Sequence, residues 1–541
     1  MAPDSDRSLG RAGAAAVQWA IGLAAFGGAL GVVTYRSFDL DRFFVPKELA
    51  LHAGALIIVT TLAARTAKRG LSRSDLALGA WLGLSIVSAI FATSGWHAIR
   101  AISLTLSAGV LFWGARALRE SGGSRRAVLL LGAAVTVASL TSLAQAYGIE
   151  ANLFAANRAP GGTLGNRNFI AHIAAMGLPI LLWLSATARS SPRALGGAFA
   201  ILVLTAALVL SRTRAAWLAL VVWGVIALPV VWKGRATIAA ALVPRRGRLL
   251  VGALGVGAVL ALAMPNALDW KSDSPYLDSV MGVVNYREGS GAGRVKQYLN
   301  SLKLVRQHPV LGVGPGNWAS EYPAVVPRSD PSLADGTGMT ANPWPSSDWI
   351  AALAERGVLA AGALGLFVLF LLAGAWRSWT NMELSARERL GALAGGSVVL
   401  IGVVEGSFDA VVLLAFPSVI LWGAAGALIP RGPVLSERRP LLKERIVRGA
   451  IVALVWIGIV QMPAAKLYAM RLYTQGSYDS IRKAALYDPE SYRIQLKAAE
   501  ILAARGQCRL AYHNGINALS LFPYAQAARA VVARCTKSDR D

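Results

Sequence analysis

The chain is poor in charged residues, and cysteine and histidine are scarce. Only 15% of its 541 residues are charged, 55% are apolar, and the mean hydropathy is +0.50. Soluble domains carry about a quarter charged residues. This composition therefore excludes a soluble globular protein and predicts a polytopic membrane protein. Two cysteines and five histidines show no metal-ligand spacing, so we expect neither a catalytic metal nor another cofactor.

Acidic residues are also scarce, at 29 against 54 Lys and Arg, for a formal net charge of +25. The basic residues lie in short runs between apolar segments rather than in one domain, so we expect no nucleic-acid partner. By the positive-inside rule, the basic loops are cytoplasmic and the loops poor in Lys and Arg lie outside. The basic loops are 65–73, 116–126, 233–248, 377–389 and 431–448, and the others are 94–100, 211–214 and 406–410.

Long apolar runs predict an all-α bundle of about twelve to thirteen transmembrane helices. No small-residue cleavage site follows the first run, so we expect that helix to be retained. The charge pattern then predicts a cytoplasmic N-terminus. The predicted spans are 16–34, 48–64, 76–94, 100–118, 126–146, 169–187, 194–211, 215–232, 249–265, 353–375, 388–406, 411–429 and 446–463.

One hydrophilic segment, residues 266–348, interrupts this pattern. It belongs to a predicted membrane domain of residues 1–465 and lies outside, in the periplasm of a Gram-negative cell. A membrane protein with one large loop among short ones usually does its chemistry there. The tail, 466–541, is predicted on the same side.

The tail reads as amphipathic helices rather than membrane spans. Asp488-Pro489 and Phe522-Pro523 are 34 residues apart and flank a helix–turn–helix pattern. This spacing predicts a tetratricopeptide-like unit, with an ordinary amphipathic hairpin as the alternative. In an antiparallel stack Cys508 and Cys535 would be neighbours, so a disulfide between them is one outcome in an oxidising compartment.

Three arginines are candidates for binding an anionic headgroup. Arg212 and Arg214 lie at the predicted outer end of a helix, where an arginine either marks a substrate site or anchors the helix by snorkelling. Arg294 is expected to open a helix, where free backbone N–H groups also favour anions. Because guanidinium groups form paired hydrogen bonds to phosphate, arginines facing one crevice could clamp a diphosphate.

Two further polar groups accompany these arginines. Asn166, Arg167 and Asn168 stand at the outer start of a helix, where Asn166 could cap the helix or the cluster could contact sugar hydroxyls. His172 lies one turn into that helix. His308 precedes a proline and a GxGxG run, which we interpret as a tight turn, and His308 is a weaker substrate-binding candidate.

Four stretches together resemble the O-antigen ligase and polymerase superfamily of bacterial inner membranes. They are GTLGNRNFIAH, SRTRAAWLAL, the loop unit GR…HPVLGVGPGNW, and DWIAALAERGVLAAGAL, which enters the next span. RFFVPKELAL is also similar to family members. Their order around one large outer loop carries the resemblance, which covers about residues 30 to 430.

The resemblance implies a metal-independent glycosyltransferase of the inner membrane. It would move a glycan from an undecaprenyl diphosphate carrier to an acceptor hydroxyl, among membrane lipids. In ligases the acceptor is lipid A–core, and in polymerases it is a growing glycan. Arg214 and Arg294 match the family's two functional arginines. Other polysaccharide-assembly proteins could bind through the tail.

One position departs from the ligase pattern. Ligases carry a histidine where this sequence has Ser346, and a serine cannot act as a base near neutral pH without an activating partner. Asp348 and Asp409 are the ionisable alternatives. The departure leaves ligase and repeat-unit polymerase both open. A transporter of lipid-linked glycans is a third hypothesis, although it would predict paired inverted halves, which the sequence lacks.

Overall fold

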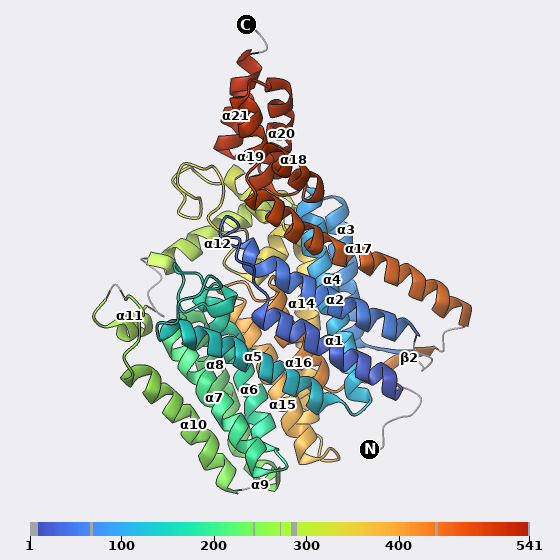
Figure 1. Cartoon of the computed structure of the whole chain (residues 1–541). Coiled ribbons are helices and arrows are strands. Elements are labelled where there is room, and N and C mark those ends of the chain that lie inside the picture. The colour runs from blue at the N-terminus through green and yellow to red at the C-terminus, as the bar shows by residue number, and fades with distance from the viewer. Residues whose placement is uncertain are drawn as a thin grey trace.

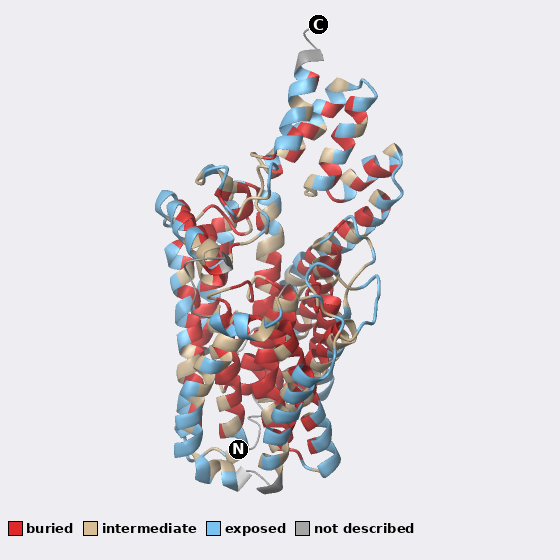
Figure 2. Ribbon diagram, turned by 90° about the vertical axis from the view of Figure 1, so that its left-hand side faces the viewer, coloured by how far each residue is buried: buried red, intermediate tan, exposed pale blue. Residues whose placement is uncertain are grey.

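The computed structural model describes residues 9–64, 69–241, 244–270, 272–282, 289–438 and 442–538. Within these ranges most of the chain is helical, and each of the thirteen predicted apolar segments is a helix. The all-α fold class is therefore confirmed. Buried residues concentrate along the centre of the bundle, while exposed residues cover its outside and the projecting tail (Figure 2).

Within the described residues, eleven helices are long and apolar enough to cross a membrane. They begin and end near the predicted bounds because runs of about 20 apolar residues set both their length and their place. They are α1 (Arg11–Leu30), α2 (Asp41–Ala64), α3 (Arg73–Ile90), α4 (Gly95–Glu120), α5 (Ser124–Ala146), α6 (Arg167–Ala186), α7 (Ser191–Ser211), α8 (Arg214–Lys233), α10 (Pro244–Ala263), α14 (Asp348–Thr380) and α17 (Leu442–Thr474).

Two predicted spans, α15 (Ala386–Glu405) and α16 (Ala415–Leu428), fall outside this set. The 14 residues of α16 extend about 21 Å, which is less than the roughly 30 Å of a bilayer core. All of them are buried, so neighbouring helices replace lipid around α16. Charged residues occupy both ends of α15, including the fully buried Glu405.

The large loop and the tail lie at the same end of the bundle, and the start of α1 lies toward the other end (Figure 1). The loop contains α11 (Pro275–Met281), α12 (Gly289–Gln307), α13 (Trp318–Glu321) and the 3-10 turn η2 (Tyr322–Ala324). This arrangement fits a loop and a tail on one side of the membrane, and the identity of that side stays a prediction.

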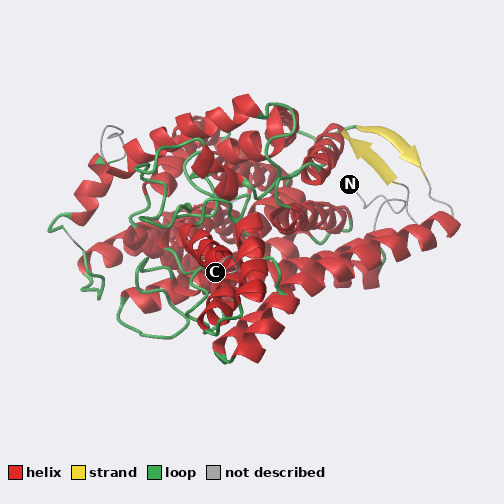
Figure 3. Cartoon of the chain, turned by 90° about the horizontal axis from the view of Figure 1, so that it is seen from above, coloured by secondary structure: helices red, strands yellow, loops and turns green. Residues whose placement is uncertain are grey.

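The opposite end carries α9 (Arg235–Ala241) and a small sheet that sequence reasoning missed. Strand β1 (Arg69–Ser72) pairs antiparallel with β2 (Val434–Arg438), with Gly70 opposite Glu437. The sheet lies at the edge of the molecule (Figure 3). It joins two of the basic loops that the charge pattern placed on one side.

The tail begins without a break in the chain's helical structure. Helix α17 passes through the predicted boundary at Lys466 and ends at Thr474. Four short helices follow, and the two predicted turns lie where α18 and α20 end. The tetratricopeptide-like assignment stays a prediction. These helices are α18 (Tyr478–Tyr487), α19 (Tyr492–Ala504), α20 (Cys508–Leu521) and α21 (Gln526–Ser538).

The two cysteines of the tail lie in one place, as predicted. Cys508 begins α20, Cys535 lies in α21, and both pack in an apolar cluster with Leu502 and Ala511. The structure does not join these two cysteines in a disulfide. The tail also contacts the large loop, because the backbone amide of Gln526 donates a 2.9 Å hydrogen bond to the carbonyl of Thr337.

Candidate active site

The start of α6 supplies the first polar side chains of the site. Asn166 caps this helix by accepting a 3.0 Å hydrogen bond from the backbone amide of Asn168, as the sequence suggested. The side chain of Asn168 is thereby left for other partners. Its Nδ2 donates to Asp409 Oδ2 at 2.8 Å, and its Oδ1 accepts from the Thr213 hydroxyl at 3.3 Å.

Arg212 occupies a sharp turn between α7 and α8. Its backbone is in the left-handed region, with φ of 53°, a conformation that residues other than glycine rarely adopt. The Cζ atom lies 4.5 Å from the ring centroid of Trp270, and Nε donates a 3.0 Å hydrogen bond to the Ser279 hydroxyl. The turn and these two contacts fix the direction of the guanidinium.

The charges around Arg212 are mostly of its own sign. Burial lowers the pKa of Arg212, the positive charges of Arg167 and Arg214 lower it further, and Asp278 opposes them. Like charges held together cost free energy unless an anion offsets them. The arrangement therefore favours an anionic ligand.

Arg214 begins α8 beside this group. Its Nη1 donates a 2.9 Å hydrogen bond to the carbonyl of Gly282, at the end of α11. This contact holds the large loop against α8. Arg214 therefore contributes through its charge and through the position of the loop.

Arg294 lies within α12 rather than at its start. Helix α12 begins at Gly289, five residues earlier than the sequence suggested. The expectation that Arg294 opens a helix was wrong, because the Gly- and Ser-rich residues before it continue the helix. The helix terminus thus adds no backbone donors at Arg294, and the guanidinium itself carries any anion binding.

One large cavity, called here the arginine cavity, collects most of the predicted residues. Its volume is about 1350 Å³, and it lies between the α5–α6 connection, the α7–α8 turn, the large loop and the α15–α16 connection. Among the described residues, Arg214, His308 and Asp348 do not line it. The predicted residues that line it are Asn166, Arg167, Asn168, Arg212, Arg294 and Ser346, together with Asp409.

Asp348 is engaged elsewhere. Its carboxylate is buried and accepts backbone hydrogen bonds from Val411 at 3.0 and 3.1 Å and from Val412 at 2.9 Å. Its own amide donates to the carbonyl of Gly406 at 2.7 Å. These bonds tie the start of α14 to the segment that carries Asp409. They favour a structural role for Asp348 over that of a base.

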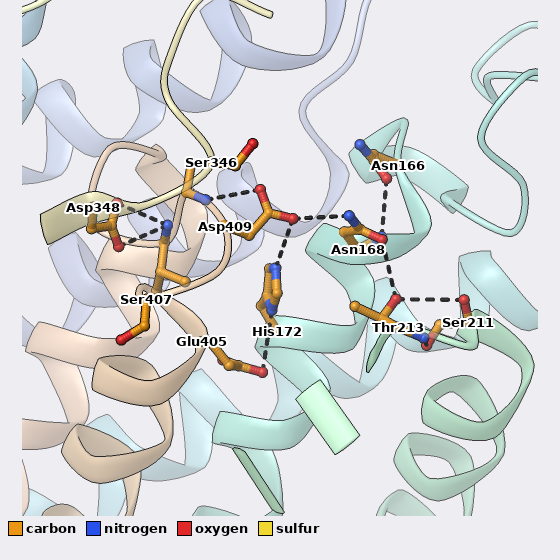
Figure 4. A network of polar contacts seen from close by, with 12 residues as sticks. Asn166, Asn168, His172, Ser211, Thr213, Ser346, Asp348, Glu405, Ser407 and Asp409 are labelled. Atoms are coloured by element: carbon orange, nitrogen blue, oxygen red, sulfur yellow. Dashed lines mark hydrogen bonds and ion pairs between the residues drawn. The ribbon is translucent and has the colours of Figure 1, made fainter. Parts of the chain in front are cut away.

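Asp409 lies at the centre of a buried polar chain (Figure 4). Nε2 of His172 is 3.4 Å from Asp409 Oδ2, and Nδ1 of His172 is 3.2 Å from Glu405 Oε1. His172 and Glu405 are fully buried, whereas the side chain of Asp409 keeps 12% of its surface exposed and reaches the cavity. The contacts run from the fully buried Glu405 through His172 to Asp409 at the wall of the arginine cavity.

The surroundings of Asp409 keep it ionised. Burial raises the pKa of its carboxyl, but the hydrogen bond and charge of His172, the charge of Arg294 and the amide of Ala410 outweigh burial. The pKa therefore lies below its ordinary value. A carboxylate lining this cavity can accept a proton or a hydroxyl hydrogen bond.

Ser346, where the resemblance leads us to expect a histidine, is held mainly through its backbone. Its amide donates a 2.7 Å hydrogen bond to Gln297 Oε1, and its carbonyl lies 2.6 Å from the Tyr298 hydroxyl. Gln297 and Tyr298 belong to α12, three and four residues after Arg294. Ser346 therefore sets the distance between Arg294 and the start of α14.

His308 lies at the exposed C-terminal end of α12, away from the residues that line the arginine cavity. The GxGxG run after it forms tight turns, with φ of 66° at Gly312 and 99° at Gly314. A Cβ at Gly312 would lie 2.3 Å from the backbone of Glu355. The interpretation of this run as a tight turn is confirmed.

Sequence reasoning missed two residues of this site, Trp270 and Glu405, and underrated a third, His172. Trp270 was not considered, and nothing in its local sequence distinguishes it from an ordinary loop tryptophan. Glu405 gave a readable signal, because a carboxylate in the last turn of an apolar helix is costly unless it is paired. The same reasoning connects it to His172.

The fold and the cavity define a multi-pass membrane protein with an arginine-rich cavity at one end. Residues 198–365 match the family model described as O-antigen ligase. The match confirms the resemblance to that superfamily, and it spans Arg212, Arg214, Arg294 and Asp348. It supports a role of the membrane glycosyltransferase type in O-antigen assembly. A comparison with curated proteins gives no match.

Proposed function

We propose that this protein transfers a glycan from an undecaprenyl diphosphate carrier to an acceptor hydroxyl, in the manner of an O-antigen ligase. One observation carries the proposal: Arg167, Arg212 and Arg294 line the same cavity as the carboxylate of Asp409. Cationic groups suit the diphosphate, and a carboxylate suits the hydroxyl. One cavity then offers groups for both the donor and the acceptor of the transfer reaction.

The arginines bind the donor and stabilise the diphosphate as it leaves the sugar. As the bond between the sugar carbon and the diphosphate oxygen breaks, its electron pair leaves with the diphosphate and adds negative charge there. Pre-positioned guanidinium groups therefore stabilise the transition state, which carries this charge, more than they stabilise the ground state. Trp270 and Ser279 hold Arg212 in place before the donor arrives. Arg214 adds a nearby positive charge.

Asp409 acts as the base. The acceptor oxygen forms its bond to the sugar carbon, and the proton of that hydroxyl passes to Asp409. Asn168 and His172 orient the carboxylate through Oδ2. This assignment replaces Asp348, whose oxygens serve backbone amides, and it explains how Ser346 can stand where ligases carry a histidine.

Donor binding prepares this base. Arg294 is one of the charges that lower the pKa of Asp409. A bound diphosphate offsets the charge of Arg294, so the pKa of Asp409 rises toward the range in which a base works best at neutral pH. The base therefore gains strength when the donor is present.

The acceptor separates the two versions of this function. Transfer to lipid A–core makes the protein a ligase, and transfer to another lipid-linked repeat unit makes it a polymerase. The arginine cavity serves either, because the donor is the same. We place the reaction at the periplasmic face of the inner membrane, with the N-terminus in the cytoplasm.

A lipopolysaccharide gel of a strain without this protein tests the proposal, with lipid-linked glycans extracted in parallel. Loss of the whole ladder, with long lipid-linked polymer accumulating, would identify a ligase. A ladder collapsed to core plus one repeat would identify a polymerase. An unchanged ladder with an unchanged pool of lipid-linked glycan would contradict O-antigen transfer. Purified protein that joins glycan to acceptor in detergent would exclude the transporter hypothesis.

A further inference from the structure

A second cavity lies beside the arginine cavity, and we call it the tail cavity. Its volume is about 480 Å³. The walls come from the first turns of α2 and α4, from α14 and the 413–417 segment, and from the tail residues 488–493. The membrane part and the tail therefore build this space together, and neither would enclose it alone.

Two ion-paired groups face this cavity from its two sides. On the membrane side, Arg100 Nη2 lies 2.8 Å from Asp41 and 2.9 Å from Glu48. On the tail side, Lys466 Nζ lies 2.7 Å from Glu490 and 4.0 Å from Asp488. The carboxylates and cations here offset one another, unlike the cationic group of the arginine cavity.

Aromatic side chains separate the two cavities. Phe169 and Trp344 line both of them, and Phe44 lines the tail cavity. The ring centroid of Trp344 lies 5.3 Å from that of Phe44 and 6.3 Å from that of Phe169. The partition is one side chain thick, so a ligand in the tail cavity lies close to the residues of the donor site.

Some polar atoms among the lining residues lack a hydrogen-bond partner. Nε of Arg356 and Oδ1 of Asp488 are both buried, and neither makes a hydrogen bond within the described residues. A buried polar atom without a partner costs roughly 1–3 kcal/mol. One is a donor and the other an acceptor, and both belong to residues that line the cavity, so its walls carry polar groups of both kinds.

We propose that the tail cavity binds a saccharide portion of the acceptor, whose attacking hydroxyl passes Phe169 and Trp344 to reach Asp409. This inference rests on the proposed transfer function. Sugar hydroxyls both donate and accept hydrogen bonds, which suits a wall that carries carboxylates and cations together. The aromatic rings add apolar lining for sugar C–H groups. The balance of charge suits a polyhydroxyl ligand better than a second diphosphate.

Filling the cavity from the tail tests this proposal. Ser491 lines it and makes its turn contacts with Asp488 and Gln495 through the backbone, so Ser491→Trp adds bulk without removing an ion pair. The matched control is Ser520→Trp, at an exposed position of α20 outside the cavity. Leu413→Trp fills the cavity from the membrane side, should the tail variant fail to fold.

The assay uses the purified full chain in detergent, with a lipid-linked glycan as donor. Rough-type lipopolysaccharide and a lipid-linked single repeat serve as acceptor probes. We expect Ser491→Trp to raise the acceptor KM at least tenfold, with donor binding and thermal stability as in Ser520→Trp. An unchanged acceptor KM in both filled variants would overturn the proposal.

Direct binding separates this inference from the proposed function. Core oligosaccharide released from rough-type lipopolysaccharide, and soluble repeat-unit oligosaccharide, are titrated into the parent chain and into Ser491→Trp. Saccharide binding that only the parent shows would keep the tail cavity as a saccharide site, even if no glycan transfer is found. A parent chain that binds neither saccharide would reject the site, whether or not transfer is observed.

Discussion

Asn168 and Asp409 are 241 positions apart in the chain and meet through a 2.8 Å hydrogen bond from Nδ2 to Oδ2. The first stands in the opening turn of α6, and the second follows α15. Their contact joins the polar start of one helix to the polar end of another, at the wall of the arginine cavity. The base that we propose is thereby fixed relative to the arginines.

Two aspartates near this wall should respond differently to the same change. We expect Asp409→Asn to reduce glycan transfer by about 10²–10⁴-fold, the usual contribution of a general base, with donor binding retained. We expect Asp348→Asn to destabilise the protein, because charge-assisted hydrogen bonds contribute roughly 1.5–3 kcal/mol each and Asp348 serves two backbone amides. Transfer rates and melting curves of both variants decide this.

The reverse pattern would contradict the assignment of the base. Should Asp348→Asn stay stable and lose transfer while Asp409→Asn stays active, Asp348 would be the base. Donor binding provides the control in each case. An inactive Asp409→Asn protein that still binds the lipid-linked donor has lost the chemical step rather than the site.

Arg294 should be required for transfer but not for folding. Removing one donor of charge stabilisation in a transition state typically costs about 10²–10³-fold, so Arg294→Ala should lose at least 100-fold in kcat. Arg294→Lys should recover only part, because an ammonium lacks the paired donors of guanidinium. Arg306→Ala is the matched control, since Arg306 is an exposed residue of the same helix. Normal glycan with a stable Arg294→Ala protein would reject the diphosphate clamp.

Much of this site was readable from local sequence, because local sequence decides helices and their ends. The apolar runs predict the spans, and Asn166 predicts the start of α6. Arg212 could be singled out because an arginine at the end of a membrane helix is costly without a purpose, and Arg167 because it stands between two asparagines at a helix start. Each of these inferences needs only the few residues around the one concerned.

The remainder depends on contacts between distant segments. Asp348 and Asp409 have similar local surroundings, at outer helix ends, and only the three-dimensional structure shows that one bonds backbone amides while the other reaches the cavity. Trp270 gains its importance from Arg212, 58 positions before it. The start of α12 was misplaced because glycines that usually interrupt a helix continue one here.

His172 should set the pH dependence of transfer. Its hydrogen bond and charge lower the pKa of Asp409, so His172→Gln should raise that pKa. The base is lost when Asp409 takes up a proton, and the acidic limb of the kcat–pH profile should therefore move to higher pH. His308→Gln is the control, because His308 is exposed at the end of α12. An acidic limb at the same pH in both variants would show that His172 does not set the pKa of the base.

Trp270 should act on donor affinity through Arg212. A cation–π contact at a partly exposed site contributes about 1 kcal/mol, which corresponds to a change of roughly fivefold in binding. We expect Trp270→Ala to raise the donor KM by about that factor and to leave kcat nearly unchanged. Trp270→Phe should behave more like the parent because it keeps a ring under the guanidinium. Equal donor KM values for Trp270→Ala and the parent would show that the turn and Ser279 position Arg212 without Trp270.

The packing of the tail against the membrane part should become less stable as pH rises. Burial, together with the negative charges of Glu490 and Asp41, raises the pKa of Asp488 to about 6 against the opposing charges of Lys466 and Arg100. A carboxyl whose pKa is higher in the folded state than in the unfolded state stabilises that state most at low pH. The contribution falls as pH passes from about 4 to about 6.

Hydrogen exchange in α18 and α19 measures the stability of this packing. We expect exchange in these helices, corrected for the intrinsic rise of exchange with pH, to be slower relative to the membrane helices at pH 5 than at pH 7. Asp488→Asn carries no titrating group at this position, so its corrected exchange should lose most of the pH dependence. Asp479→Asn is the matched control, because Asp479 lies on the exposed side of α18. A pH dependence that persists in Asp488→Asn would assign the effect to another group of the tail cavity.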